Sequence, residues 1–248
     1  MTSPFTRKTL AFLRAIKRNN DREWFKARKA DYEMHVRQPM IELLARLAVD
    51  FRTFAPELVA DPKVSLYRTY RDTRFSGDKT PLKTHAAAHF PHRRLGKSGG
   101  GGLYLEVAPG WVWIGGGIYM PGTHELAAIR AHIDANHVSL RRIVERRAFV
   151  KAVGELQGEQ LTRAPRGYPK EHPAAHYLRF RQFLAGREYP AEFAYGPRFY
   201  SELLGVFRQV APLVRFLNTP ILERPVDPLL VDMARQQPGG KRLSFDVV

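Results

Sequence analysis

Apolar side chains recur at helical spacing near the start of the chain and predict three helices. Residues 6–18 carry them on one stripe of a short amphipathic helix. Asn20 or Asp21 then supplies an N-cap for a second helix over 22–36. Pro39 suits the first turn of a third helix, so the N-terminal part of the chain is expected to be helical.

The middle of the chain changes to alternating apolar and polar positions, which is typical of strands. Residues 63–70 alternate and are rich in β-formers, so they predict a strand, and the Ser, Gly and Pro residues of 71–81 predict a loop. The segments 103–107 and 111–115 flank Ala-Pro-Gly at 108–110, a pattern that predicts a β-hairpin.

Helical spacing returns from Thr123, the predicted N-cap of the C-terminal helices. A strand is expected near Phe183 and a last helix over 197–218. Strands flanked by runs of helices favour an α+β protein with an antiparallel or mixed sheet. The chain shows no convincing linker, so we expect a single domain over residues 4–220 and an extended or loose tail over 221–248.

Composition narrows the classes of function. The 248 residues contain no cysteine, which excludes disulfides, zinc–thiolate sites and cysteine nucleophiles. The chain has no apolar run that could span a bilayer, and its N-terminus has no signal-like core, so a cytoplasmic location with no membrane partner is expected. The formal net charge of +16 attracts anions such as nucleic acid or phosphorylated ligands, and the alternative is that part of this charge is a general compositional bias toward arginine.

The positive charge is concentrated in one segment. Between positions 63 and 97 the chain has nine Lys or Arg residues against two Asp and no Glu. Residues 68–85 contain the cations Arg68, Arg71, Arg74, Lys79, Lys83 and His85 with the acids Asp72 and Asp78. Arginine and lysine in such numbers favour contact with phosphate or carboxylate groups, so this segment is the candidate ligand-binding site.

Local structure suggests how these cations would meet. Thr80 and Pro81 fit the N-cap and first position of a helix over 82–90, whose free N–H groups would bind an anion together with Lys79 and Lys83. Asn20 and Trp24 are expected to line the same cleft. The alternative is that Arg68 and Arg74 pair with the chain's own acids, namely Asp72, Asp78, Glu23 or Glu106, and only hold the loop in place.

Catalysis is a second possibility at this segment. Asp72, Asp78 and His85 are the candidate catalytic residues of a metal-assisted phosphoester hydrolase. His85 and His89 have the i, i+4 spacing of a zinc pair on a helix, but no third ligand is evident, and no metal site is predicted. Gly96-Lys97-Ser98 is treated as a chance match, because the preceding glycine of a phosphate-binding loop is absent.

Several motifs resemble those of a known family. The matching pieces are Asn19–Phe25 with Lys29 and Tyr32, then 70–85, 115–121 and 163–173. Their order and spacing are similar, over roughly residues 4–220, to the DUF2461 family of conserved hypothetical proteins from bacteria and fungi. Two positions depart from the pattern, since Leu82 stands where tyrosine is common and Gly77 where lysine is common. The resemblance implies a single domain and brings no established activity.

Together these observations predict a protein that binds a phosphorylated or polyanionic ligand through its strand–loop–helix segment 68–85. Nucleotide, nucleic acid and phosphorylated metabolite all remain open as the ligand. The alternatives are the hydrolase and a non-enzymatic interaction scaffold. The sequence predicts neither a cofactor nor an oligomeric state, and it leaves open whether the protein is an enzyme.

Overall fold

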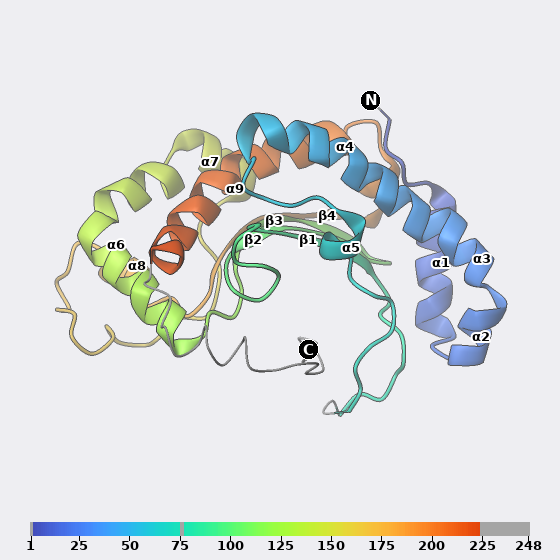
Figure 1. Ribbon diagram of the computed structural model, residues 1–248, viewed down its shortest axis with the longest axis horizontal. Coiled ribbons are helices and arrows are strands. Elements are labelled where there is room, and N and C mark those ends of the chain that lie inside the picture. Colours follow the sequence, from blue (N-terminus) through green and yellow to red (C-terminus); the bar gives the residue numbers. More distant parts are fainter. Residues whose placement is uncertain (1, 75–76, 224–248) are drawn as a thin grey trace.

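A four-stranded antiparallel sheet forms the centre of the molecule (Figure 1). The computed structural model describes residues 2–74 and 77–223. The strands lie in sequence order as β1 (Ala86–Pro91), β2 (Gly102–Val107), β3 (Trp111–Ile118) and β4 (Phe183–Pro190). The predicted hairpin is therefore β2–β3, and the strand expected near Phe183 is β4. Helices flank this sheet, which confirms the α+β class.

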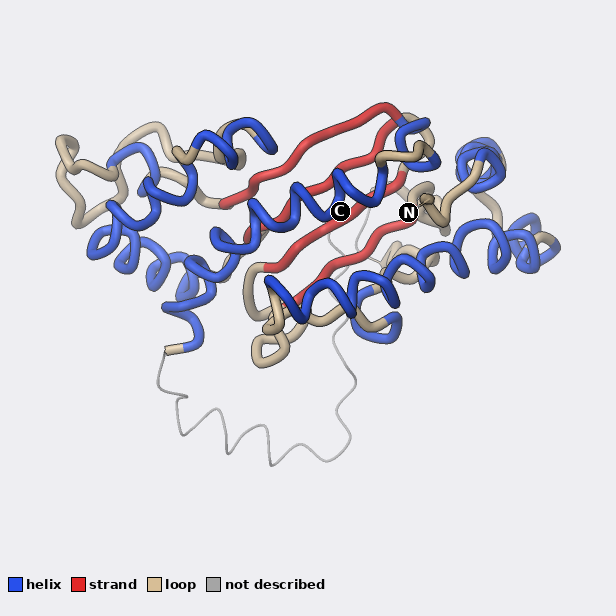
Figure 2. The backbone as a smooth tube through the Cα atoms, turned by 90° about the horizontal axis from the view of Figure 1, so that it is seen from above, coloured by secondary structure: helices blue, strands red, loops and turns tan. Residues whose placement is uncertain are grey.

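Helices pack on one face of the sheet, which we call the upper face (Figures 1 and 2). Alternate residues of the strands point into this layer, so Leu103, Leu105 and Ile114 are fully buried. Phe90 of β1 packs edge-on against Phe51 and Phe207, with ring centroids 5.3 and 5.5 Å apart. These rings come from α4 (Gln38–Phe54) and α9 (Phe199–Leu222), so the core lies between the sheet and these two helices.

The N-terminal helices agree with the prediction except for breaks in the second one. The observed elements are α1 (Arg7–Arg18), α2 (Arg22–Ala27), α3 (Lys29–Tyr32), η1 (Glu33–Arg37) and α4. Asp21 caps α2 by accepting a hydrogen bond from the Trp24 N–H at 2.8 Å. Backbone at Arg28 leaves the helical region, and the wider turn of η1 then leads directly into α4, so Pro39 lies within a continuing helix.

The strand predicted over 63–70 is wrong. Pro62–Ser65 is instead a helical turn, α5, because Asp61 accepts a hydrogen bond from the Lys63 N–H at 2.7 Å and the proline fits the first position. The chain becomes extended only afterwards, and it pairs through single bridges, Leu66 with Ala88 and Tyr70 with Leu82.

The helix predicted over 82–90 is also wrong, because residues 86–91 form β1. Three successive alanines favour a helix, but pairing along the whole of β2 overrides that preference. Ala88 and Phe90 point into the core, while His89 points to the other face. No helix therefore begins at Thr80 and Pro81, and the predicted anion site at a helix start does not exist.

The C-terminal half contains α6 (Thr123–Val144), α7 (Arg147–Val153), α8 (Ala175–Leu178), β4, η2 (Ala191–Tyr195) and α9. Gly122, not Thr123, is the N-cap of α6, and the helix kinks at Asn136. Helix α9 extends through Leu222, so the predicted loose tail begins inside a helix. The rest of that tail, 224–248, lies outside the described residues. In the described part of the chain, no helix has the length and apolar character needed to cross a membrane.

Candidate functional site

The basic segment forms a two-armed ribbon, residues 66–74 and 77–85, that hangs below the sheet (Figure 1). Its arms are antiparallel: the Arg71 N–H donates to the Pro81 carbonyl at 2.9 Å, and the Lys83 N–H donates to Thr69 at 2.7 Å. Asn20 anchors the ribbon, because its side-chain amide donates to the Leu82 carbonyl and accepts from the Leu82 N–H, both at 2.9 Å.

Near the ribbon tip, cations interact with the ribbon's own oxygens. Arg71 forms an ion pair with Asp78, and Arg74 forms one with Asp72. The Lys79 ammonium donates to the Thr73 carbonyl at 2.9 Å. Hydrogen bonds from the Thr80 N–H and from Arg71 lower the pKa of Asp78 to about 2. The alternative of internal pairing therefore holds for Arg74, and Arg71 pairs internally as well, which was not expected.

Two other predicted ligand residues are engaged in local structure. Both polar atoms of the Asn20 side chain are used on Leu82, as described above. Trp24 packs against Phe12, with ring centroids 5.9 Å apart, and the Arg28 guanidinium lies 4.7 Å from the Trp24 ring centroid. Asn20 therefore helps the site by holding the ribbon, while Trp24 belongs to the packing of the N-terminal helices.

The face of the sheet opposite the helices, the lower face, carries a row of polar and aromatic side chains. His89 of β1 lies directly opposite Tyr104 of β2, and Glu106 lies opposite Trp113 of β3. Tyr104 also contacts Trp113, with ring centroids 5.8 Å apart. These four side chains are partly buried, unlike the fully buried aliphatic residues of the upper face.

Two lysines meet above one tyrosine ring at the edge of this face. The Lys97 ammonium nitrogen lies 3.8 Å from the Tyr67 ring centroid, and the Lys83 ammonium lies 4.9 Å from it. Lys97 also donates a hydrogen bond to the Leu66 carbonyl at 3.2 Å. Tyr67 in turn contacts Tyr104 edge-on at 6.3 Å, so the lysines adjoin the aromatic row.

Burial and like charge lower the pKa of Lys97 to about 8. Desolvation of the half-buried ammonium is the larger cause, and repulsion from Lys83 adds to it. No carboxylate of the described residues forms an ion pair with Lys97. Within the described part of the chain, the charge of this ammonium group is therefore stabilised by one cation–π contact and by one carbonyl.

Burial also lowers the pKa values of two histidines at the lower face, His89 and His85. Desolvation lowers the pKa of His89 to about 4, and Lys97 contributes through repulsion. Its Nδ1 is buried and has no hydrogen-bond partner among the residues that the structure describes. Burial lowers the pKa of His85 as well, against the attraction of Glu106, whose Oε1 lies 3.9 Å from the His85 Nδ1. Both imidazoles are therefore neutral at pH 7.

Glu106 accepts hydrogen bonds at the other end of the row. The Tyr104 hydroxyl donates to Glu106 Oε2 at 2.8 Å, and the Trp111 indole N–H donates to Oε1 at 3.2 Å. Desolvation, with the Glu106 charge next in size, raises the pKa of Tyr104. The carboxylate thus fixes the two aromatic rings and keeps Tyr104 in its protonated form.

The loop that carries Lys97 is attached to the helical layer by a buried amide. The Asn218 side chain of α9 accepts from the Gly101 N–H at 2.7 Å and donates to the Gly101 carbonyl at 3.0 Å. Asn218 is 1% exposed, so these bonds are shielded from water. This arrangement repeats that of Asn20 and Leu82, and the two loops that bring Lys83 and Lys97 to Tyr67 are both held in this way.

A groove of about 300 Å³ continues from this cluster toward α2 and η1. Its walls include Tyr67, Arg68 and His85, with Tyr32 and Arg37 on the helical side. The structure therefore places the predicted residues Arg68 and His85 in the wall of one groove, together with Tyr67. A groove of this size is at the lower limit of small-ligand sites.

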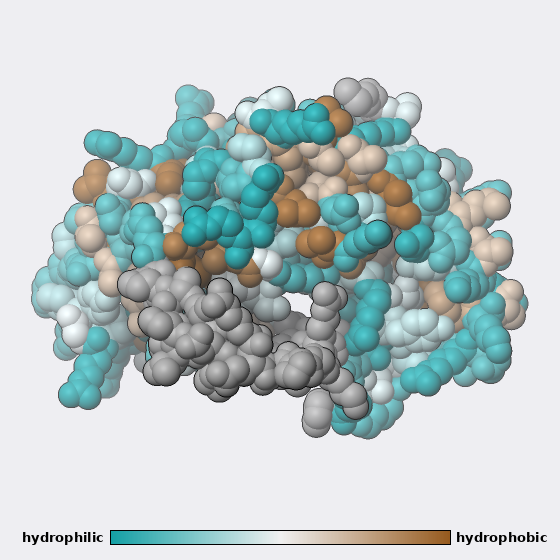
Figure 3. All heavy atoms as spheres, in the orientation of Figure 1, coloured by the Kyte–Doolittle hydropathy of each residue, from teal (hydrophilic) through white to brown (hydrophobic). Residues whose placement is uncertain are grey.

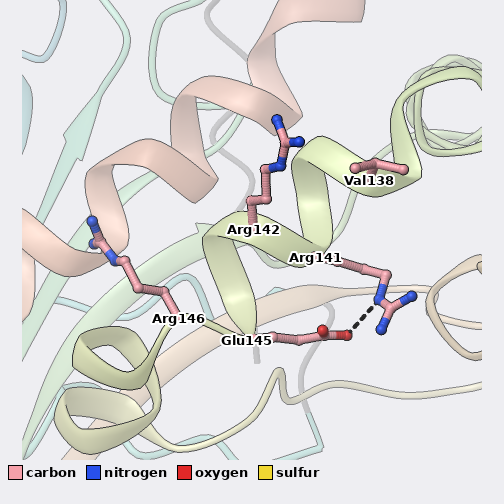
Figure 4. A pocket seen from close by; sticks show the side chains of 5 residues that line it. All are labelled: Val138, Arg141, Arg142, Glu145 and Arg146. Carbon is pink, nitrogen blue, oxygen red and sulfur yellow. Dashed lines mark hydrogen bonds and ion pairs between the residues drawn. The ribbon is translucent and has the colours of Figure 1, made fainter.

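A second depression, of about 390 Å³, lies on α6 (Figure 4). Val138, Arg141, Arg142, Glu145 and Arg146 line it. Figure 4 shows Arg141 directed at Glu145, with a 2.8 Å hydrogen bond, and away from Arg142 and Arg146. Arg146 donates to the Gln209 side chain at 2.6 Å. The guanidinium groups diverge, so this depression is not our candidate site.

Metal ligation receives no support from the geometry. Among residues 2–74 and 77–223, no three His, Asp or Glu side chains are grouped so that they could hold a metal ion. His89 lies in β1 and His85 in the bend just before that strand, so neither is on a helix and they do not form the helical zinc pair considered from sequence.

The sequence analysis did not assign six residues of the lower face to the candidate site: Lys97, His89, Tyr67, Tyr104, Glu106 and Trp113. Alternation over 102–107 already placed Tyr104 and Glu106 on one face, so reading 86–91 as a strand would have added His89. No sequence signal joins Lys97 to Tyr67, which lies thirty positions earlier and meets it only in the folded chain.

Comparison with known proteins gives a family and no activity. No curated protein matches the chain. The model of a family described as conserved hypothetical protein (DUF2461) matches residues 8–216, which include the ribbon, all four strands and most of α9. The chain therefore belongs to the DUF2461 family.

Proposed function

We propose that this protein binds a phosphorylated or polyanionic ligand on the lower face of its sheet, beside Lys97 and Lys83. The observation that carries the proposal is the meeting of these two ammonium groups over Tyr67, at 3.8 and 4.9 Å. Holding like charges together inside a half-buried site costs free energy. A bound anion would lower that cost, because its charge offsets that of the half-buried Lys97 ammonium.

The surroundings favour a ligand that combines an anionic group with a planar ring. Tyr67, Tyr104 and Trp113 form a continuous aromatic row that leads away from the lysines. Aromatic faces stack on nucleobases and other flat rings, as single-strand-binding proteins show. A nucleotide fits this chemistry well, and a phosphorylated metabolite or a nucleic-acid strand shares it. The cytoplasmic location expected from the sequence stays a prediction within this proposal.

The hydrolase alternative has weaker support. Asp78 is engaged by Arg71 and by the Thr80 N–H, and Asp72 is paired with Arg74. Both carboxylates therefore neutralise arginines of the ribbon, and His85 lies beside Glu106 instead of either aspartate. The overall positive charge suits anion binding in either case, and hydrophilic residues make up most of the surface seen in Figure 3.

The test is thermal unfolding with sodium pyrophosphate, AMP and a short single-stranded oligonucleotide, each measured over a range of concentrations. A ligand present at 100 times its dissociation constant adds about 2.7 kcal/mol to the free energy of unfolding. Lys97→Ala should abolish the gain. The matched control is Lys63→Ala, an exposed lysine of α5, which should leave the gain unchanged.

A second comparison separates the lower face from the ribbon tip. The double variant Arg71→Ala/Lys79→Ala removes two tip cations, and under our proposal it keeps most of the gain. If the double variant loses the gain while Lys97→Ala keeps it, the ligand binds at the tip and our assignment of the site is wrong. If no anion stabilises the wild-type protein, the interaction scaffold takes the place of the proposed function.

A further inference from the structure

The lysine pair over Tyr67 has the arrangement of a reactive amine. Lys97 comes from the loop between β1 and β2, and Lys83 from the ribbon, yet both lie on the same ring. An amine becomes nucleophilic when burial or a second cation disfavours its protonated form, and both factors act here. The Leu66 carbonyl accepts a hydrogen bond from Lys97 at 3.2 Å, and this fixes the position of the nitrogen.

We propose that Lys97 is a nucleophile that forms an imine with the aldehyde or ketone group of an anionic ligand. This inference rests on the proposed function for its site, and it adds a chemical class, a phosphorylated carbonyl compound. A cation that only neutralises phosphate has no need of a deprotonated form, whereas imine formation requires one.

The proton state of Lys97 supports this role. With a pKa of about 8, roughly one amine in ten is neutral at pH 7. A lysine with its ordinary pKa would have roughly one neutral amine in three thousand at that pH. Lys83 places a second positive charge beside Lys97, and this charge favours the approach of an anionic ligand.

The covalent step balances without a further reactant. The lone pair of the neutral Lys97 nitrogen forms a bond to the carbonyl carbon, and the π pair of the C=O bond moves to oxygen. The resulting carbinolamine loses that oxygen as water, which takes both hydrogens of the amine. The product is a neutral imine, and no oxidant or reductant takes part. Neighbouring Tyr67 and His89 are neutral at pH 7 because burial raises the pKa of the phenol and lowers that of the imidazole.

The experiment treats the full chain with pyridoxal phosphate, an aromatic aldehyde that bears a phosphate, and then reduces any imine with cyanoborohydride. Mass spectrometry of the intact protein and its peptides locates the adduct. We expect a single fast-forming adduct on Lys97, at least tenfold faster than on exposed lysines such as Lys63. Pyridoxal without its phosphate should label Lys97 more slowly.

Lys97→Arg separates this inference from the proposed function. Arginine keeps the positive charge, so the variant should still be stabilised by pyrophosphate, but it should lose the fast adduct. If pyrophosphate stabilises the wild-type protein and labelling spreads evenly over exposed lysines, the nucleophile is disproved while anion binding stands. If pyrophosphate has no effect and uncharged aldehydes still label Lys97 selectively, the reactive amine stands and anion binding is disproved.

Discussion

The Lys97 ammonium nitrogen lies 3.8 Å from the centroid of the Tyr67 ring, although the two residues belong to different loops. Tyr67 lies just after α5, at the start of the ribbon, and Lys97 lies in the glycine-rich loop after β1. Their contact is where the two loops meet, and Lys83 joins it from the second arm of the ribbon. The charge, the aromatic surface and the partial burial of the site all follow from this meeting.

Anion binding should weaken as the pH rises through the pKa of Lys97. This pKa is about 8 in the free protein, and a bound anion raises it by favouring the charged form. Sulfate is the useful probe, since its charge is constant from pH 6 to pH 10. We expect the thermal stabilisation by sulfate to fall between about pH 8 and pH 10 in the wild-type protein.

Lys97→Arg is the control for this pH profile, because a guanidinium stays charged throughout the range. Its stabilisation by sulfate should stay level up to pH 10. A wild-type profile that is equally level would show that Lys97 is not the group that titrates.

The free energy of unfolding should fall on acidification because of His89. The pKa of this residue is about 4 in the folded chain, below its ordinary value of 6.5. Between these values the unfolded state binds the proton and the folded state does not, so stability is full above pH 6.5 and declines toward pH 4. The loss is about 3 kcal/mol, at about 1.4 kcal/mol for each pKa unit.

Urea unfolding at pH 7 and at pH 4.5 measures this loss. The free energy of unfolding should differ less between pH 7 and pH 4.5 in His89→Gln than in the wild-type protein, because glutamine does not titrate. His124→Gln, which changes an exposed histidine of α6, should leave the difference as it is in the wild-type protein. Equal pH dependence in all three proteins would contradict the assignment to His89.

Asn218 should contribute strongly to stability and to the position of Lys97. Asn218→Leu leaves both the N–H and the carbonyl of Gly101 without partners in a buried place, at a cost of about 3 kcal/mol. Thr219→Ala is the matched control, because that hydroxyl bonds only within its own helix, to Arg215 at 3.0 Å. Urea unfolding gives both costs, and a loss below about 1 kcal/mol for Asn218→Leu would contradict the role.

Glycine at position 186 should be required for full stability, because the Trp113 ring lies against it. A Cβ atom added at Gly186 would come within 2.2 Å of the Trp113 ring, which is closer than any real contact. We expect Gly186→Ala to cost about 1–3 kcal/mol, since the ring must move. In a Trp113→Ala background the same change should cost clearly less. Unfolding free energies of the four proteins in this cycle give the coupling, and purely additive costs would disprove the contact.

The sequence predicted the helical layer well and the site only in part. Helical spacing is a local property, so residues such as Leu13 and Phe207 could be assigned to the core directly. The alanines at 86–88 have a local preference for helix, and only their pairing with β2 makes them a strand. Arg71 and Asp78 were recognised as charges, but the sequence does not show whether they pair with each other or with a ligand, because that depends on contacts that form only in the folded chain.

The two hydrogen bonds between the Asn20 side chain and the Leu82 backbone, here called the amide clamp, separate the part of the ribbon whose length can change from the part whose length cannot. The clamp fixes the ribbon close to Lys83, whereas the described residues 72–74 and 77–80 lie beyond it and contact one another. Insertions or deletions in that stretch would leave the lysine at its ring, because the backbone on the inner side of the clamp keeps its course. Homologues could thus carry tips of different size on an unchanged binding face.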